Sequence, residues 1–378
     1  MSKQTNRKYG LIIVLLVFLL AGLWAGWHWL TVGRYYQSTD DAYVAGNLVN
    51  VMPQVSGNVK AVYVDETQQV VTGQPLVVLD DADARLAFSR AESTLAETVR
   101  SVAAQYQTAD AATALVDQRK VELERARSDL NRRAGLHDAR AVSGEDLEHA
   151  RLSVVAAQAA LLAAQRNRDA ARAAVLATPV TQHPAVLHAE AQLRQAWLDL
   201  QRTTIAAPVS GQVAKRTVQV GEHVTPGSLL LAVVPEQQIW VDANFKENRL
   251  AQVRVGQPVD LVTDLYGSDV VFHGHVAGLA AGTGNVFSLL PAQNATGNWI
   301  KVVQRLPVRI ALDSSELKAH PLQLGLSVTA TVDLHDQKSG QSVLATTGRP
   351  LYSTPVLSID MRPVERDIQH ILAQNLHP

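Results

Sequence analysis

The chain of 378 residues contains no cysteine, and its charges almost cancel. The missing thiols exclude disulfide bonds, thiolate metal sites and a cysteine nucleophile. Lysine and arginine number 34 against 35 aspartates and glutamates, so the chain has no basic field of the kind that attracts nucleic acid. No phosphate-binding loop, Ser-His-Asp grouping or paired-carboxylate pattern stands out. The sequence therefore predicts neither an enzyme nor a cofactor-binding protein.

Helix-breaking residues are almost absent from the longest regular stretch. Between Leu76 and Thr178 there is no proline, and the only glycines are Gly135 and Gly144, which we place on either side of a turn. Apolar residues recur at every seventh position on both sides, and a row of alanines follows three residues after the second row, as in the seam of a coiled coil. The first row is Phe88, Leu95, Val102, Ala109, Val116, Leu123 and Leu130; the second is Leu147, Val154, Leu161, Arg168 as the exception, and Val175; the alanines are Ala150, Ala157, Ala164 and Ala171.

These rows predict an antiparallel helical hairpin over residues 82–203. Each arm of about 50 residues would be roughly 75 Å long at 1.5 Å per residue. Prolines at Thr178-Pro179 and His183-Pro184 interrupt the second arm, so we expect a kink or loop near its base. A dimerising coiled coil is the alternative explanation of the same periodicity.

No charged residue occurs between Tyr9 and Gly33. The core of this run, 11–30, has the roughly 20 residues with which a helix crosses a bilayer. Basic residues before it and tryptophans towards its end predict a cytoplasmic N-terminus and an aromatic belt at the far interface. A cleaved signal peptide is the alternative, but its apolar region would be only about 7–15 residues long. We therefore predict an uncleaved anchor, to which we assign Leu11, Leu20, Trp24, Trp27 and Trp29.

Two segments, 55–79 and 209–233, are versions of one another at a constant offset of 154 residues. Each copy contains short β-branched strands separated by turns, and neither is large enough for a core of its own. We therefore expect the halves 49–81 and 204–234 to pair into one small β-sandwich that the hairpin interrupts. The identical positions are Val55, Ser56, Gly57, Val59, Val64, Val70, Gly73 and Leu76 in the first copy and Val209, Ser210, Gly211, Val213, Val218, Val224, Gly227 and Leu230 in the second.

The repeated motif V-S-G-x-V…V-x-x-G-x-x-L is similar to half of a biotinyl/lipoyl domain. Split by a helical hairpin, it resembles the membrane fusion proteins, or periplasmic adaptors, of the HlyD family, and among them those of the EmrA type. Three further stretches carry the resemblance: TDDAYVAGN at 39–47, WVDANFKE at 240–247 and PAQNATGNWIK at 291–301.

The resemblance implies a single-pass protein of the bacterial inner membrane, with most of its chain in the periplasm. It would link an EmrB-like major-facilitator drug exporter to a TolC-like outer-membrane channel for multidrug efflux. The implied partners also include the lipid bilayer and further copies of the chain as a homo-oligomer, but no nucleic acid. An adaptor of an ABC-type peptide or protein exporter is the alternative, and a membrane-tethered structural coiled-coil protein is the alternative of another class.

After residue 235 the pattern changes to short alternating strands. Apolar residues alternate with polar ones from Ile239 to Phe245, and 253–259 and 324–328 are typical of strand–turn–strand elements. We predict a small antiparallel β-barrel over 235–335, which agrees with the resemblance. The fold class is then α+β, comprising a transmembrane helix, a split lipoyl-like sandwich with an inserted helical hairpin, and the barrel. The remaining segments are a cytoplasmic tail at 1–10, a linker and first strand at 31–48, and a C-terminal tail at 336–378 with a short amphipathic helix predicted at 362–375.

The turn of the hairpin, at about 134–144, is the predicted contact site. Ser143 is placed to cap the second arm, because an acidic residue, Asp146, follows three positions later. The spacing of Arg132, Leu136 and Ser143 resembles the tip motif by which such adaptors meet a TolC-like channel. Each residue also has a structural alternative: a helix cap, a solvated arginine or a leucine that closes the seam. The sequence does not identify drug-binding residues.

Other chemically suggestive residues have simpler explanations. His273 and His275 would share one strand face, as metal ligands can, but no third ligand accompanies them. Asp80, Asp81 and Asp83 are expected to cap the first hairpin helix and complement its dipole. A lipoate or biotin carrier would need a lysine where the two halves join, and Asp80 to Ala84 and Thr203 to Ala207 contain none.

Overall fold

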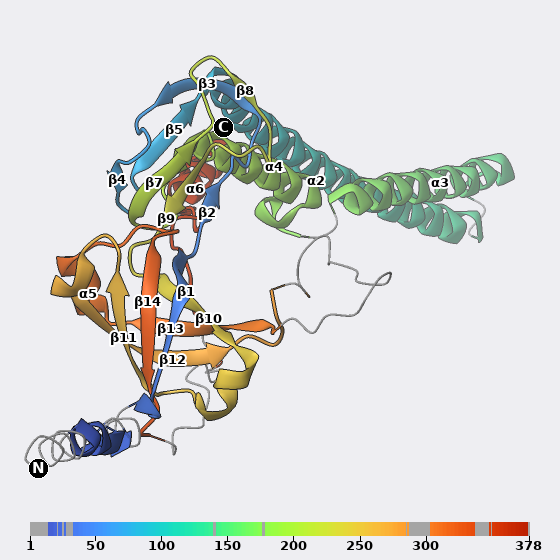
Figure 1. The fold of residues 1–378 in the computed structure, drawn as a ribbon. Coiled ribbons are helices and arrows are strands. Elements are labelled where there is room, and N and C mark those ends of the chain that lie inside the picture. The colour runs from blue at the N-terminus through green and yellow to red at the C-terminus, as the bar shows by residue number, and fades with distance from the viewer. Residues whose placement is uncertain are drawn as a thin grey trace, which may run out of the picture.

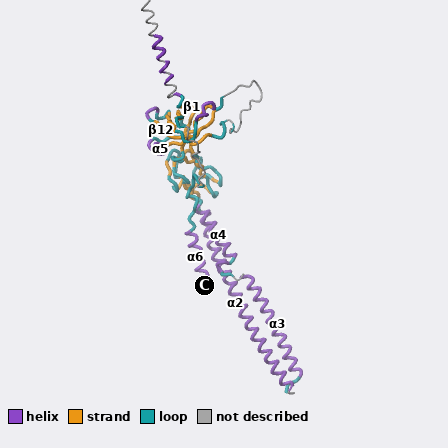
Figure 2. The backbone as a smooth tube through the Cα atoms, turned by 90° about the horizontal axis from the view of Figure 1, so that it is seen from below, coloured by secondary structure: helices purple, strands orange, loops and turns teal. Residues whose placement is uncertain are grey.

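The computed structural model describes residues 14–20, 22–24, 26–27, 33–138, 141–175, 178–284, 286, 303–336, 348 and 350–376. They form a β-barrel, a β-sandwich and a helical hairpin in a row (Figure 1). Figure 2 shows the N-terminal helical residues beyond the barrel, at the end opposite to the hairpin. The α+β class, with a long hairpin and two β domains, is confirmed.

Residues 14–20, 22–24 and 26–27 are helical, and the side chains of Leu20, Trp24 and Trp27 are exposed. Leu11 and Trp29 lie outside the described residues. Within the described part of the chain, no helix has both the length and the apolar character of a membrane span.

Six antiparallel strands close the barrel in the order β1-β10-β13-β12-β11-β14. Alternation places Val241, Ala243 and Phe245 in its core, as the sequence predicted. The first strand, β1, belongs to this barrel, because Ala42 pairs with Ala243 on one side and with Val328 on the other. The strands are β1 (Tyr36–Gly46), β10 (Ile239–Lys246), β11 (Pro258–Thr263), β12 (Val271–Leu279), β13 (Arg305–Leu312) and β14 (Ser327–Asp333), with short helices η3 (Glu247–Gln252), η4 (Gly267–Asp269) and α5 (Ser314–Ala319) between them.

The two predicted strand–turn–strand elements of the barrel are only half correct. Gly256 and Gly325 adopt the positive φ values of 93° and 85° that tight turns require. A strand follows each turn but none precedes it, because η3 leads into the first and irregular backbone into the second. Residues 291–301, which carry part of the resemblance, lie outside the described residues.

The sandwich consists of two four-stranded sheets, β2-β9-β7-β4 and β6-β5-β3-β8, and each sheet contains strands from both sides of the hairpin. Pairing of β3 with β8 and of β4 with β7 joins the two repeat copies directly. Repeated apolar residues such as Leu76 and Leu230 meet in one core. The strands are β2 (Val49–Val51), β3 (Gly57–Val62), β4 (Gln69–Val70), β5 (Pro75–Leu79), β6 (Thr204–Ala206), β7 (Gly211–Arg216), β8 (His223–Val224) and β9 (Leu231–Val234).

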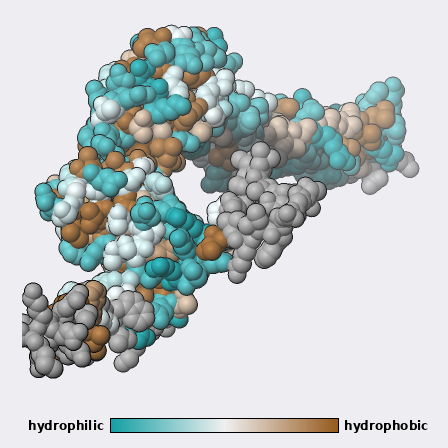
Figure 3. All heavy atoms as spheres, in the orientation of Figure 1, coloured by the Kyte–Doolittle hydropathy of each residue, from teal (hydrophilic) through white to brown (hydrophobic). Residues whose placement is uncertain are grey.

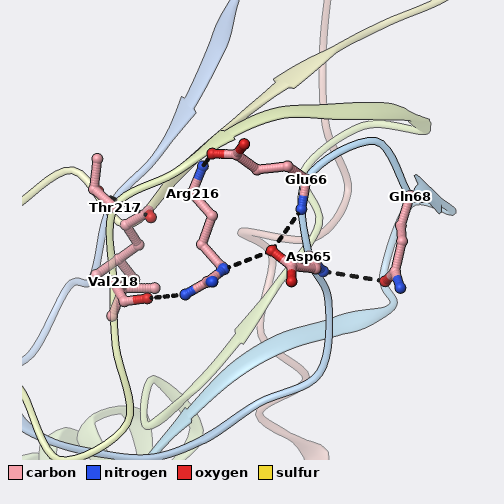
Figure 4. Close-up of polar contacts among 7 residues, drawn as sticks. Asp65, Glu66, Gln68, Arg216, Thr217 and Val218 are labelled. Atoms are coloured by element: carbon pink, nitrogen blue, oxygen red, sulfur yellow. Dashed lines mark hydrogen bonds and ion pairs between the residues drawn. The ribbon is translucent and has the colours of Figure 1, made fainter.

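A polar contact also joins the two copies (Figure 4). The Arg216 Nε donates to Asp65 Oδ1 at 2.9 Å, and the Arg216 backbone N–H donates to Glu66 Oε1 at 3.0 Å. The hydrogen bond from Arg216 is the main reason that the pKa of Asp65 lies below its usual value. Arg216 of the second copy therefore holds the loop after β3 of the first copy.

The hairpin comprises α2 (Ala82–Asp138), α3 (Gly144–Val175), η2 (Val180–Gln182) and α4 (Pro184–Gln201). The 57 residues of α2 extend about 85 Å at 1.5 Å per residue. Every residue of the two apolar rows and of the alanine row is buried or half-buried. Arg168 fits its row because its head group reaches Asp169 at 2.6 Å while its side chain is 24% exposed.

The predicted interruption of the second arm is confirmed. Pro184 occupies the first turn of α4, where its missing N–H costs nothing, and His183 caps that helix by accepting a hydrogen bond from the Ala185 N–H at 3.2 Å. Tyr106 of α2 donates its hydroxyl to the Val175 carbonyl at 3.0 Å. The break is therefore fastened to the opposite arm.

Candidate functional site

The hairpin tip is the far end of the molecule from the N-terminal helical residues (Figure 2). Helix α2 continues through Gly135 to Asp138, so Gly135 lies inside the helix and not beside the turn as predicted. The Ala141 N–H donates to the Leu136 carbonyl at 2.9 Å, which ends α2, and α3 begins at Gly144. The turn is thus shorter than the predicted span of 134–144.

Ser143 caps α3. Its Oγ accepts a hydrogen bond from the Asp146 N–H at 3.1 Å and donates one to Asp146 Oδ2 at 2.7 Å. The bond from the Ser143 hydroxyl is the largest reason that the pKa of Asp146 lies below its usual value. The cap geometry predicted from the spacing is therefore present, and it accounts for a serine at this position without any partner.

Arg132 lies one turn before Leu136 on α2, and its side chain is 72% exposed. It forms an ion pair with Asp129, which also holds Arg133 through Nε at 2.7 Å. Pairs this exposed contribute little to stability. The Arg132 guanidinium is therefore mostly solvated and remains accessible to a partner.

Leu136 is 43% exposed, whereas Leu123 of the seam is 4% exposed. The next seam position after Leu130 is 137, where a half-buried histidine stands. Leu136 therefore does not close the seam, and the structural alternative proposed for it fails. An exposed leucine on the last turn of a solvated helix presents apolar surface that a partner can bury. The structure places Arg132 and Leu136 in the last two turns of α2 and Ser143 at the N-terminal cap of α3.

The base of the hairpin holds a feature that sequence reasoning did not assign. The C-terminal helix α6 (Arg362–Leu376) packs against α2 and α4 through Val364, Ile368 and Leu372, all buried. The helical spacing of these residues predicted an amphipathic helix, which is confirmed. Its docking site could not be read from the sequence, because the apolar face of α6 would fit many surfaces equally well.

The other candidate residues have structural roles. His273 Nδ1 donates a hydrogen bond to Glu316 Oε1 at 2.7 Å, and this contact raises the pKa of His273. Across the described ranges no group of three or more potential ligands could hold a metal ion. At the start of α2, Asp80 Oδ1 accepts from the Ala82 N–H at 3.2 Å, and Asp81 pairs with Arg85 at 2.6 Å. These aspartates thus act at the helix N-terminus, as expected.

Comparison with known proteins identifies two family domains and close full-length relatives. Residues 82–203 match the EMRA alpha-helical hairpin domain, and residues 238–335 match the AAEA-like beta-barrel domain. The chain is 43% identical to the probable multidrug resistance protein EmrK of Escherichia coli (strain K12), over 99% of this chain and 97% of that protein. It is 46% identical to the multidrug export protein EmrA of the same strain, over 93% and 90%. A solved structure, described as that of the periplasmic adaptor protein EmrA, is 18% identical with a TM-score of 0.41 and covers 80% of this chain and 99% of that chain.

Proposed function

Because the chain belongs to the EmrA-type membrane fusion proteins, we propose that it links a major-facilitator drug exporter in the inner membrane to a TolC-like channel in the outer membrane. The observation that carries this proposal is the geometry of the hairpin. Helix α2 is about 85 Å long and ends in an exposed tip, opposite to the N-terminal helical residues (Figure 2). A compact core does not need a helix of this length, whereas a protein that spans the distance between two partners does.

We propose that residues 11–30 anchor the chain in the lipid bilayer as a single span. The uncharged run from Tyr9 to Gly33 and the basic residues before it support a cytoplasmic N-terminus and a periplasmic location for the rest. The barrel would then lie nearest to the inner membrane, and the tip would point towards the outer membrane. The exporter would supply the energy.

We propose that Arg132, Leu136 and Ser143 contact the outer-membrane channel. The exposure of Leu136 and Arg132 supports this role, since a partner can bury the apolar surface of the leucine and accept hydrogen bonds from the arginine. Self-association is proposed as well. Leu152, Val155 and Leu162 leave exposed apolar side chains along α3, which supports packing between neighbouring hairpins.

The decisive experiment compares two leucines of the hairpin in cells that depend on this chain for drug resistance. Leu136→Asp should abolish resistance while the protein stays abundant and still co-purifies with its exporter. Leu115→Asp, at a residue of 37% exposure on the shaft of α2, is the matched control for an added charge and should weaken resistance far less. A photo-cross-linker at position 136 should capture the channel.

Two outcomes would overturn parts of the proposal. Full resistance in the Leu136→Asp cells, with no cross-link from position 136, would show that the tip is only a turn. Co-purification with an ABC-type transporter instead of a major-facilitator exporter would leave the adaptor role intact but assign the chain to peptide or protein secretion.

A further inference from the structure

The two ends of the barrel carry opposite charge. Because neighbouring strands are antiparallel, one end collects residues 33–37 at the start of β1, the segment 246–257 between β10 and β11, residues 303–306 at the start of β13 and residues 333–336 at the end of β14. We call it the anchor end, since the N-terminal helical residues lie beyond it (Figure 2). The charged residues in these ranges are Arg34, Lys246, Arg249, Arg254 and Arg305, against Glu247, Asp333 and Asp336. At the opposite end, the loops 264–270 and 313–326 carry Asp264, Asp269, Asp313 and Glu316, against Lys318 alone.

Most of the cations at the anchor end are available to a partner. Arg305 is paired with Asp41, but within the described ranges the other four form no ion pair. Arg249 reaches the Gln37 amide oxygen at 3.3 Å, and Arg254 donates to a backbone carbonyl at 2.9 Å. Figure 3 shows hydrophilic residues over much of the barrel surface next to the N-terminal residues. The four cations without an ion pair are Arg34, Lys246, Arg249 and Arg254, and all four are exposed.

An aromatic cluster fastens the start of β1 to the end of β14 at the anchor end. The rings of Tyr35 and His335 stack with their centroids 4.4 Å apart, and Tyr36 meets the same histidine edge-on at 5.8 Å. The Leu334 N–H donates to the Tyr35 carbonyl at 2.8 Å, and the Arg34 guanidinium lies 5.4 Å from the centre of the Tyr35 ring. Tyrosines and long basic side chains of this kind suit the headgroup level of a bilayer.

The anchor end cannot lie far from the membrane if residues 11–30 span it. Residues 31–35 alone separate that span from Tyr36 of β1, and even fully extended they reach no more than about 20 Å. Anionic phospholipids attract basic residues that come within about 8 Å, the Debye length at physiological ionic strength. The same field repels the acidic loops at the other end. The charge asymmetry of the barrel therefore favours one orientation, with the anchor end against the bilayer.

We propose that the anchor end of the barrel is a second membrane contact, which binds the headgroups of anionic phospholipids through its four cations without an ion pair. Arginine side chains donate charge-assisted hydrogen bonds to phosphate oxygens, and these bonds fix orientation as well as distance. The inference rests on the proposed single-span anchor and goes beyond it, because a single helix leaves the barrel free to tilt. Seating the barrel on the bilayer aims the hairpin away from the membrane.

Fluorescence quenching in lipid nanodiscs tests this contact on the full chain, without an exporter. Because the chain contains no cysteine, a single introduced thiol carries the fluorophore. Ala251→Cys, at an exposed residue of η3, reports on the anchor end, and Leu265→Cys, at a residue of 54% exposure, reports on the opposite end as the matched control. The quencher is a fixed fraction of lipid with a nitroxide on its headgroup, in nanodiscs of phosphatidylcholine or of an equal mixture with phosphatidylglycerol.

Quenching at position 251 should be at least about 2-fold stronger in the nanodiscs that contain phosphatidylglycerol, because these lipids draw the anchor end to the headgroups. The gain should disappear in 1 M NaCl, where the Debye length is only about 3 Å. Quenching at position 265 should stay weak in both lipids.

Charge variants identify the residues that make the contact. Arg249→Gln combined with Arg254→Gln should remove more than half of the gain from phosphatidylglycerol, whereas Arg249→Lys combined with Arg254→Lys should keep most of it. Lys318→Gln removes an exposed positive charge from the opposite end of the same barrel and should leave the gain unchanged.

Three results would overturn the proposal: equal quenching at position 251 in the two lipids, a gain that persists in 1 M NaCl, or a full gain in the folded double glutamine variant. Absence of quenching at position 251 in both lipids would also overturn it and would leave the anchor end to a protein partner. In each of these cases the chain stays in the nanodiscs, so the anchor itself stands. A chain that does not enter nanodiscs would overturn the anchor and this contact together.

Discussion

Arg194 of α4 holds Glu365 of α6 through two parallel hydrogen bonds, from Nε to Oε1 at 2.6 Å and from Nη2 to Oε2 at 3.0 Å. The same guanidinium reaches Glu190 Oε2 at 3.1 Å, one turn earlier on α4. A bidentate arginine–carboxylate pair fixes orientation as well as distance. The C-terminal helix is therefore held in one register on the base of the hairpin, although 171 residues separate the two partners.

The apolar contacts of α6 should matter more to its docking than this ion pair does. Ile368→Ala removes a fully buried side chain and should cost about 2–5 kcal/mol of docking free energy. Glu365→Gln should cost about 1 kcal/mol or less, because the Glu365 side chain is 44% exposed. Hydrogen exchange of residues 362–376 measures both effects, with exposed Gln369→Ala as the control. Equal loss of protection in the two variants would contradict this ranking.

Docking of α6 should depend on pH with a maximum in mildly acidic solution. Burial and the charge of Asp367 raise the pKa of Glu92, so the ionised Glu92 side chain weakens the docking of α6 at neutral pH. Protonation of Glu92 removes this penalty as the pH falls towards 4.5, and docking becomes stronger. The hydrogen bond from Arg194 lowers the pKa of Glu365, so its contribution is present above pH 4.5 and is lost as the pH falls through its folded pKa.

Hydrogen exchange of α6 across this pH range tests both signs. Protection should rise from pH 7 towards pH 4.5 and fall below it. Glu92→Gln should remove the rise on the neutral side, and Glu365→Gln should remove the fall on the acidic side. A monotonic profile in the unmodified chain would contradict the assignment of opposite shifts to these two carboxyl groups.

The turn after β3 contains a non-glycine residue with a strained backbone, and the equivalent position of the second repeat copy is a glycine. Thr67 has a φ of 71°, and Gly221, which stands 154 positions later in the other copy, has a φ of 87°. A left-handed conformation costs a non-glycine residue about 1–2 kcal/mol. Thr67→Gly should therefore raise the free energy of unfolding of the sandwich by about 1 kcal/mol, and Gly221→Thr should lower it. Chemical denaturation followed by circular dichroism measures both, and a destabilised Thr67→Gly chain would contradict this interpretation.

Elements with a local signal could be predicted from the sequence, and contacts between distant segments could not. The seven-residue rows and the repeat identify the hairpin and the paired sandwich because period and register lie within each segment. Strand β1 belongs to the barrel because Ala42 pairs with Ala243, about 200 residues away. The sequence of neither strand indicates which strand it pairs with. The docking of α6 on α2 and α4 likewise depends on contacts between segments that are distant in the sequence.

At the tip, spacing predicted the cap of Ser143 but could not separate capping from contact with the channel. Two substitutions separate them. Ser143→Asn keeps a good N-cap and enlarges the side chain, whereas Ser143→Ala removes the cap and costs about 1 kcal/mol of helix stability. If Ser143 contacts the channel as we propose, Ser143→Asn should reduce drug resistance and cross-linking from position 136 while the α3 amides keep their exchange protection. If it acts only as a cap, Ser143→Asn should retain full resistance, and Ser143→Ala should show only faster exchange in the first turn of α3.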